Sequence, residues 1–273
     1  MTFMEMLRSA WKKSGSLLCV GLDPDLEKIP EFLRGEKNPL FRFNKAIIDA
    51  TKDQVCAYKP QAAYYAGLSA DEDLKMTIDY IHEAAPGIPV IPVILDAKRG
   101  DIGATTKMYV KEAFERYRAD AVTVNPYMGM DAVKPFLDRA DKGVIVLCRT
   151  SNPGAKEIQE LDVAGEPLYQ HVARQVSTVW NFNGNVMLVA GATFPEELGR
   201  IRRIIGDTPL LVPGVGAQGG DVKAVLENGK TADGTGLVIN SSRGIIYASS
   251  GRDFAEASGE AARKLNETIN SYR

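Results

Sequence analysis

The sequence predicts a single (β/α)8 TIM barrel domain over residues 1–273, with an N-terminal helix capping one end. Eight short apolar segments alternate with eight segments of helical periodicity. The apolar segments are nearly continuous rather than alternating, which is typical of parallel strands buried on both faces. No linker or shift in composition divides the chain, and its length is within the range of single α/β barrels. An open, doubly wound sheet is the alternative arrangement of the same elements.

The capping helix and the first three units follow from local pattern. Phe3, Met6, Leu7, Ala10 and Trp11 recur at helical spacing, which predicts a helix that covers the bottom of the core. The first three strands are predicted over residues 16–22, 55–59 and 90–95. A proline-punctuated loop follows the first strand, and the helices after these strands are predicted over residues 38–52, 71–85 and 105–118.

The alternation continues through the second half. The remaining strands are predicted over residues 121–124, 143–148, 186–190, 209–213 and 237–239. The helices that follow them are predicted over residues 131–140, 167–182, 195–205, 221–228 and 253–271. A long polar connection, from Arg149 to about Gly165, separates the fifth strand from its helix.

Composition and charge exclude several classes of protein. A formal charge of −2 offers no electrostatic footprint for nucleic acid or an anionic membrane. The N-terminal segment carries charges among its apolar residues, so it does not match a secretory signal, and no apolar run approaches a membrane span. Cys19, Cys56 and Cys148 are an odd number of cysteines among apolar neighbours, which predicts free thiols in a reducing compartment. We expect a soluble, cytoplasmic protein.

The segment after the third strand places Asp96 and Lys98 two residues apart. Side chains at this spacing share one face of a strand. If the strand conformation persists to Lys98, a carboxylate and an ammonium project together from its C-terminal end. Asp101 lies on the following turn and need not point the same way. A solvated ion pair is the plain alternative for such a pair.

Polar residues gather at the C-terminal ends of the predicted strands, where barrel active sites lie. They are Asp23, Lys59, Asp96, Lys98, Asn125, Thr150, Ser151, Gln218 and Arg243. Opposite charges within ~4–6 Å keep each other ionised. Such a site can press an anionic group of a substrate against a fixed carboxylate while lysines compensate its charge.

The segment from Gly214 to Gly219 matches G-x-G-x-x-G, but not in a dinucleotide-binding context. That fingerprint belongs in the first βα turn, with an acidic residue ending the next strand, whereas here the next strand ends in Asn240. After strand seven, with Arg243 after strand eight, the segment instead suits the phosphate site common in barrels. A tight βα loop without a ligand is the structural alternative.

Histidine chemistry is not expected. His82 and His171 are the only histidines, and both fall within predicted helices away from the strand ends. This argues against a Ser-His-Asp triad and against a histidine-rich metal site. The sequence also has no P-loop motif and no C-x-x-C pair.

The segment Asp96–Asp101 matches D-x-K-x-x-D and resembles the orotidine 5′-phosphate decarboxylase family, in its subclass with longer chains. The motif alone is shared with related sugar-phosphate barrels, but the resemblance extends over nearly the whole chain. It also includes Gly21–Pro24, Tyr58–Gln61, Thr150–Gly154, Val212–Gly216 and Asn240–Arg243.

The resemblance implies a homodimeric enzyme that converts orotidine 5′-monophosphate to UMP and carbon dioxide, the last step of de novo pyrimidine nucleotide biosynthesis. It implies neither metal nor cofactor. Asp96 would lie against the substrate carboxylate, and Lys98 would protonate C6 as that carboxylate leaves. Lys59 would order this array and contact the ribose, and Asp23 would also contact the ribose.

The remaining roles also come from the resemblance. Asp101 and Thr105 would reach into the neighbouring subunit's site, and Gln218 and Arg243 would hold the phosphate. Ser151 would face the pyrimidine, although Thr150 and Ser151 could exchange roles. The long connection after strand five would be a mobile flap.

Two other functions remain open at this point. One is a metal-dependent decarboxylase or aldolase acting on a sugar phosphate on the same barrel, which is expected to have an acidic residue where this chain has Lys59. The other is a non-catalytic barrel that binds UMP without turnover.

Overall fold

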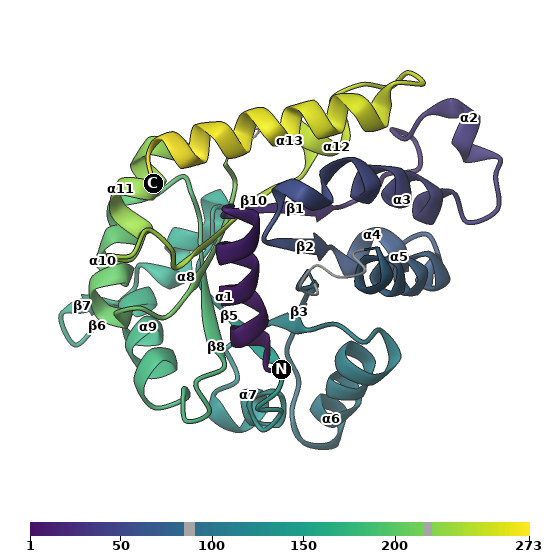
Figure 1. Cartoon of the computed structure of the whole chain (residues 1–273). Coiled ribbons are helices and arrows are strands. Elements are labelled where there is room, and N and C mark those ends of the chain that lie inside the picture. The colour runs from purple at the N-terminus through teal and green to yellow at the C-terminus, as the bar shows by residue number, and fades with distance from the viewer. Residues whose placement is uncertain (85–90, 216–219) are drawn as a thin grey trace.

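The computed structural model describes residues 1–84, 91–215 and 220–273 (Figure 1). Its main sheet consists of eight strands: β1 (Leu18–Leu22), β2 (Ala57–Pro60), β3 (Ile94–Arg99), β4 (Ala121–Val124), β5 (Gly143–Arg149), β8 (Val186–Ala190), β9 (Leu210–Pro213) and β10 (Leu237–Ser241). All neighbouring pairs are parallel. A separate antiparallel pair, β6 (Asp162–Val163) with β7 (Glu166–Pro167), lies in the long connection after β5.

The helices surround this sheet (Figure 1). They are α1 (Phe3–Ser14), α2 (Glu31–Arg34), α3 (Pro39–Thr51), α4 (Ala62–Ala66), α5 (Asp71–Glu83), α6 (Gly103–Lys111), α7 (Met130–Leu137), α8 (Lys156–Gln159), α9 (Leu168–Thr178), α10 (Pro195–Ile205), α11 (Val222–Gly229), α12 (Arg243–Ile246) and α13 (Phe254–Ser271). The described residues also form short 3-10 turns, η1 (Lys52–Gln54) and η3 (Pro153–Ala155), and a π-helical turn, η2 (Glu112–Arg116).

The sheet closes on itself between β2 and β3. The ladder runs in the order β2-β1-β10-β9-β8-β5-β4-β3, so these two strands are its ends. Two parallel bridges join them, Tyr58 with Val93 and Gln61 with Asp96, and the Tyr58 amide donates to the Pro92 carbonyl over 3.0 Å. The ring of strands confirms the predicted (β/α)8 barrel over the open-sheet alternative.

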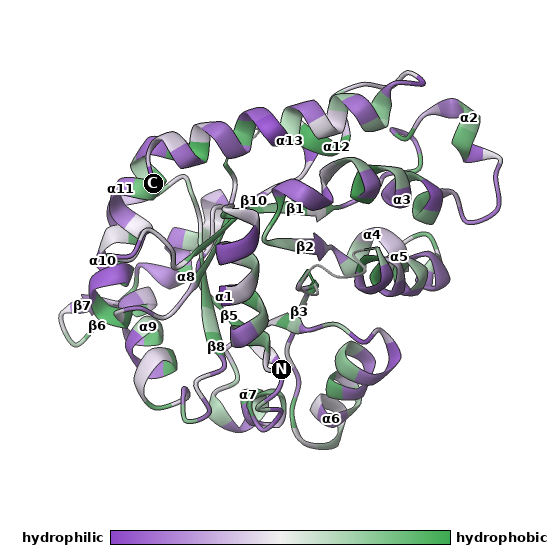
Figure 2. Ribbon diagram, viewed as in Figure 1, coloured by the Kyte–Doolittle hydropathy of each residue, from purple (hydrophilic) through white to green (hydrophobic). Residues whose placement is uncertain are grey.

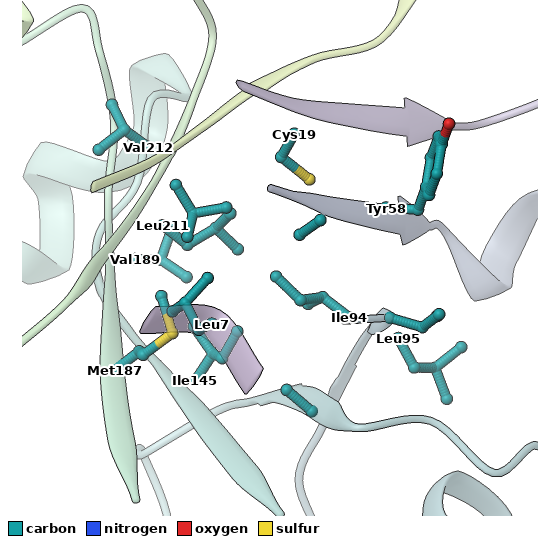
Figure 3. Close-up of a cluster of buried hydrophobic side chains, with 14 of the residues drawn as sticks. Leu7, Cys19, Tyr58, Ile94, Leu95, Ile145, Met187, Val189, Leu211 and Val212 are labelled. Atoms are coloured by element: carbon teal, nitrogen blue, oxygen red, sulfur yellow. The ribbon is translucent and has the colours of Figure 1, made fainter. Parts of the chain in front are cut away.

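The predicted capping helix is confirmed, and α1 lies across the N-terminal end of the barrel (Figure 1). Its Phe3 ring packs on Gly143, the first residue of β5, so closely that a Cβ at Gly143 would lie 2.3 Å from the ring. Leu7 projects among the lumen residues Ile145 and Met187 (Figure 3). The helix thus closes the bottom of the barrel and leaves the opposite end open for a site.

The apolar strands explain why the sheet is buried on both faces. In Figure 2 the strands are largely hydrophobic, while the surrounding helices carry hydrophobic and hydrophilic residues in alternation. Every residue of β1, β2, β4, β8 and β10 is buried. The lumen and the layer between strands and helices therefore form one continuous core.

Among the strands, the largest difference in boundaries concerns the third. It was predicted over residues 90–95, and the structure places it at Ile94–Arg99, while Val90 lies outside the described residues. The strand continues past Asp96 because Asp96 pairs with Gln61 of the β2 end and Arg99 pairs with Val124. The short helices α2, α4, α8 and α12 were not predicted, since four or five residues show little periodicity.

The three cysteines are free and buried, as the sequence suggested, although Cys56 precedes β2 rather than lying within it. Burial raises the pKa of the Cys56 thiol, and that of Cys148, to about 12. His82 lies on α5, where its Nε2 is 2.9 Å from Asp120 Oδ2. Among the described helices, none combines the length and apolar character needed to cross a membrane.

Candidate active site

A cavity of about 670 Å³ opens at the C-terminal end of the barrel, opposite α1. All eight strands of the barrel, or the loops directly after them, contribute residues to it, because parallel strands all point their C-terminal ends to one side. Of the strand-end polar residues predicted from the sequence, seven line this cavity: Asp23, Lys59, Asp96, Lys98, Thr150, Ser151 and Arg243.

Asp96 is the centre of the polar network in this cavity. Its Oδ1 lies 2.7 Å from Lys98 Nζ and accepts a hydrogen bond from the Thr123 hydroxyl over 2.9 Å. Its Oδ2 lies 3.1 Å from Lys59 Nζ and accepts a hydrogen bond from Gln61 Nε2 over 3.1 Å. Each carboxylate oxygen therefore receives one ammonium and one neutral donor, which fixes the orientation of the carboxylate.

The two lysines keep Asp96 ionised although it is only 7 % exposed. Burial raises the pKa of Asp96, but the charges of Lys59 and Lys98 outweigh burial and hold that pKa well below its ordinary value. Burial lowers the pKa of Lys59, and the charges of Asp96 and Asp23 outweigh it, so the pKa of Lys59 is raised. At neutral pH the cavity therefore contains a fixed anion between fixed cations.

Asp23 extends this charge array to the end of β1. Its Oδ1 is buried and lies 4.0 Å from Lys59 Nζ, too far for a hydrogen bond. Within the described part of the chain, that oxygen accepts no hydrogen bond. The array thus runs from Asp23 through Lys59 and Asp96 to Lys98, alternating in sign.

The backbone around Lys98 departs from a plain strand, which corrects the reasoning from side-chain spacing. Lys98 has φ +47°, in the left-handed region, and the register between β3 and β4 shifts between Leu95 and Arg99. The two side chains do meet, as expected, but a bulge rather than regular alternation sets the direction of Lys98. Bulges next to active sites commonly re-aim a side chain in this way.

Hydrogen bonds within the connection after β5 distinguish Thr150 from Ser151. The Thr150 amide donates to Gln159 Oε1, and the Thr150 hydroxyl accepts from Gln159 Nε2 and donates to Asn152 Oδ1 over 2.6 Å. The Ser151 hydroxyl has no hydrogen-bond partner among the described residues, and Ser151 lines the cavity. The Thr150 hydroxyl is therefore engaged within the connection.

An ion pair links the connection after β5 to the barrel. Arg149, at the end of β5, is almost fully buried, and its Nη2 lies 2.6 Å from Glu160 Oε1. Its guanidinium also stacks over the Phe194 ring, with Cζ 3.9 Å from the ring centroid. The sequence alone gives no sign of this role for Arg149, because charged residues at strand ends are common and only the structure shows that this one is buried.

The side of the cavity next to β9 and β10 carries the candidate phosphate site. Gly214, with φ +96°, and Val215 line it together with Ser242 and the exposed Arg243. Arg243 forms no ion pair within the described ranges. Gln218 lies outside the described residues, so its expected role at the phosphate remains a prediction.

Three expected residues do not line this cavity. Asp101 and Thr105 lie beyond the strand end, on the loop into α6 and on α6 itself, and Thr105 is exposed. Asn125, counted among the strand-end polar residues, accepts the Tyr127 amide over 3.0 Å in the turn after β4. Asn125 does follow β4 directly, at the strand end where the sequence predicted it, but its Oδ1 is engaged within its own turn and it does not line the cavity.

Sequence reasoning missed Thr123 and Tyr64, which line the cavity, and Gln61, which binds Asp96 but does not line the cavity. Thr123 and Gln61 both bind Asp96, and Tyr64, considered only as a packing residue, lines the cavity at 39 % exposure. A signal existed for Thr123, which is the single polar residue in the apolar strand Ala121–Val124. The sequence gave no comparable signal for Gln61 and Tyr64, because polar and amphipathic residues occur in loops for many reasons.

Large apolar side chains are exposed on the loop into α6, on α6, and on the loop before α7. They are Ile102 at 58 %, Met108 at 61 %, Tyr127 at 83 % and Met128 at 40 % exposure. The two loops are adjacent, since a Cβ at Gly100 would lie 3.2 Å from Met128 Cε. We call these four residues the α6–α7 apolar patch.

The chain matches the family model described as "Orotidine 5'-phosphate decarboxylase / HUMPS family" over residues 16–258. It is 57 % identical, over all of both chains, to the orotidine 5′-phosphate decarboxylase of Ralstonia pickettii, and 58 % identical, again over all of both chains, to that of Dechloromonas aromatica. The solved OMP decarboxylase of Leishmania donovani is 39 % identical with a TM-score of 0.84, covering 100 % of this chain and 98 % of that one. A putative orotidine-monophosphate decarboxylase of Toxoplasma gondii is 36 % identical with a TM-score of 0.86, covering 98 % and 96 %.

Proposed function

The chain belongs to the orotidine 5′-phosphate decarboxylase / HUMPS family, and we propose that its cavity converts orotidine 5′-monophosphate to UMP with Lys98 as the proton donor. Decarboxylation of orotidine 5′-monophosphate to UMP and carbon dioxide, in pyrimidine nucleotide biosynthesis, is the activity that the family name implies. The observation that carries the assignment of roles is the Asp96 carboxylate held between Lys59 at 3.1 Å and Lys98 at 2.7 Å.

The electrostatics of this array suit the reaction. Loss of carbon dioxide leaves an electron pair at C6 in the plane of the ring, which the ring π-system cannot delocalise. The barrier must therefore fall through fixed charges and an adjacent acid. The substrate carboxylate would lie against Asp96, and as it departs the Lys98 ammonium would stay beside the developing negative charge. A proton passes from Lys98 Nζ to C6 and gives UMP.

The remaining cavity residues fit the rest of the nucleotide. Lys59 and the buried Asp23 oxygen provide a donor and an acceptor for ribose hydroxyls. We assign Ser151 rather than Thr150 to the pyrimidine, because the Thr150 hydroxyl is already bonded to Gln159 and Asn152. We assign Arg243, which lines the cavity, to the phosphate, since a guanidinium group can bind two phosphate oxygens.

The α6–α7 apolar patch supports a homodimer with shared sites. Exposed apolar patches beside a site commonly mark an interface. Asp101 and Thr105 lie next to Ile102 of this patch and outside their own cavity, so a symmetric partner packed there would receive both residues. We propose that each site takes Lys98 from one subunit and Asp101 and Thr105 from the other.

The test of the function follows the absorbance of orotidine 5′-monophosphate over time, with and without EDTA. We expect loss of absorbance that the chelator does not change. Activity lost on EDTA treatment and restored by magnesium would favour the metal-dependent sugar-phosphate enzyme instead. Tight UMP binding with no absorbance change would favour the non-catalytic barrel.

Arg243→Ala is expected to weaken UMP binding far more than uridine binding, because uridine lacks the phosphate. A charge-assisted bidentate contact is worth roughly 1.5–3 kcal/mol, or roughly a 10- to 150-fold rise in Kd for UMP. Calorimetric titration of both ligands measures the difference. The matched control is Arg203→Ala, an exposed arginine of α10 outside the cavity, which should leave both affinities unchanged. Equal losses for UMP and uridine in Arg243→Ala would place Arg243 away from the phosphate.

A further inference from the structure

The bulge that carries the Asp96–Lys98 pair has a gap in its ladder opposite Thr123. β3 pairs Leu95 with Val122 and Arg99 with Val124 of β4. Three residues of β3, Asp96 to Lys98, therefore face the single residue Thr123. Main-chain amides at such a bulge lose their regular partners, and buried amides need replacements.

The Thr123 side chain supplies that replacement. Its Oγ1 accepts from the Ala97 amide over 3.0 Å and from the Lys98 amide over 2.9 Å. A threonine hydroxyl has two acceptor lone pairs and one hydrogen. With both lone pairs occupied by amides, its hydrogen is left for one partner, and Asp96 Oδ1 lies 2.9 Å away.

One hydroxyl thus holds both members of the pair. It binds the Lys98 backbone, whose φ of +47° is unfavourable for a lysine unless neighbouring groups stabilise it. It also binds the Asp96 carboxylate. Thr123 is only 1 % exposed, so its hydroxyl is shielded from competing water. Gln61 differs, because it binds Asp96 Oδ2 and makes no hydrogen bond to the Ala97 or Lys98 amide.

We propose that Thr123 is a positioning residue for the decarboxylation, acting through the Lys98 backbone and the Asp96 carboxylate rather than on the substrate. The proposal rests on the proposed function, in which Lys98 Nζ must reach C6. Without the Thr123 oxygen, two adjacent main-chain amides lose their acceptor, and the bulge and the direction of Lys98 are no longer fixed. Displacement of a reacting group by about 1 Å can reduce a rate by roughly 100-fold.

Thr123→Val tests this directly, since it replaces the hydroxyl with a methyl group of similar volume. We expect kcat to fall by roughly 100-fold, while the KM for orotidine 5′-monophosphate and the Kd for UMP change by less than about 3-fold. Thr123→Ser keeps the hydroxyl and should restore kcat to within roughly 5-fold of the unmodified protein.

The control is Thr77→Val. Thr77 is a fully buried threonine of α5, away from the cavity, whose hydroxyl donates to the Asp73 carbonyl oxygen and accepts from the Asn44 side-chain amide. Thr77→Val should lower the thermal midpoint and leave kcat unchanged.

Three results would overturn the proposal: an unchanged kcat in Thr123→Val, a loss of UMP affinity as large as the loss of kcat, or no recovery in Thr123→Ser. If Thr123→Val does not fold, Thr123→Ala compared with Thr123→Ser provides the same contrast between a missing and a retained hydroxyl. Failure of the proposed function is distinguishable, because it would leave the unmodified protein and the Thr77→Val control without turnover.

Discussion

Lys98→Ala is expected to abolish almost all decarboxylation while the barrel stays folded. A positioned general acid contributes roughly 10²–10⁴-fold, and removal of the fixed cation beside Asp96 adds to this loss. The cavity offers no histidine as a substitute among its described lining residues. The loss should appear in kcat, measured by the absorbance assay. The fold should persist because the Lys98 side chain is 46 % exposed and Asp96 keeps Lys59 at 3.1 Å.

Two further variants sharpen this result. Lys98→Arg keeps the positive charge but holds its proton far more tightly, so it should bind UMP and still turn over poorly. Lys37→Ala removes an exposed lysine between α2 and α3 and should behave as the unmodified protein. Substantial turnover in Lys98→Ala would remove Lys98 from the role of proton donor.

Mixing two inactive variants is expected to restore activity if the sites are shared between subunits. Lys98→Ala and Asp101→Ala homodimers should each be nearly inactive, because every site contains one lesion. In a mixed dimer both lesions fall in one site, and the other site regains its natural composition. Random pairing of equal amounts gives about half mixed dimers, so about a quarter of all sites should recover. The measurement is the activity after co-refolding, which should rise toward that fraction.

The matched control pairs Lys98→Ala with Asp96→Asn. Asp96 and Lys98 line the same cavity of one chain, 2.7 Å apart, so each site of that mixed dimer keeps one lesion and no activity should return. If verified mixed dimers of Lys98→Ala and Asp101→Ala stay as inactive as their parents, both residues act within one chain and the shared site is wrong.

The order of elements could be predicted from the sequence because it depends on local pattern. Continuous apolar strands such as Val186–Ala190 and the amphipathic spacing of α1 are set by which residues must leave water. The polar residues could be placed at one end of the barrel from the direction of the chain alone, since the C-terminal ends of parallel strands lie on the same side. Asp23, Lys59, Asp96, Lys98, Ser151 and Arg243 were found in this way.

Other features depended on contacts between distant segments. Thr123 and Gln61 became part of the site only when β4 and the end of β2 were placed beside β3. Asn125 lies at a strand end as predicted, but only the structure shows that its Oδ1 accepts from the Tyr127 amide and that it does not line the cavity.

The sequence by itself determined the barrel, its capping helix and the charges that face the cavity, because hydrophobic periodicity and strand direction are local properties. The tertiary structure alone decided how Asp96 and Lys98 meet. Their spacing suggested a regular strand. In the structure, a bulge with Lys98 at φ +47° orients the two side chains, together with hydrogen bonds to the Thr123 hydroxyl. The physical reason is that the left-handed backbone conformation is unfavourable for a lysine. Hydrogen bonds from a neighbouring strand are therefore needed to stabilise it.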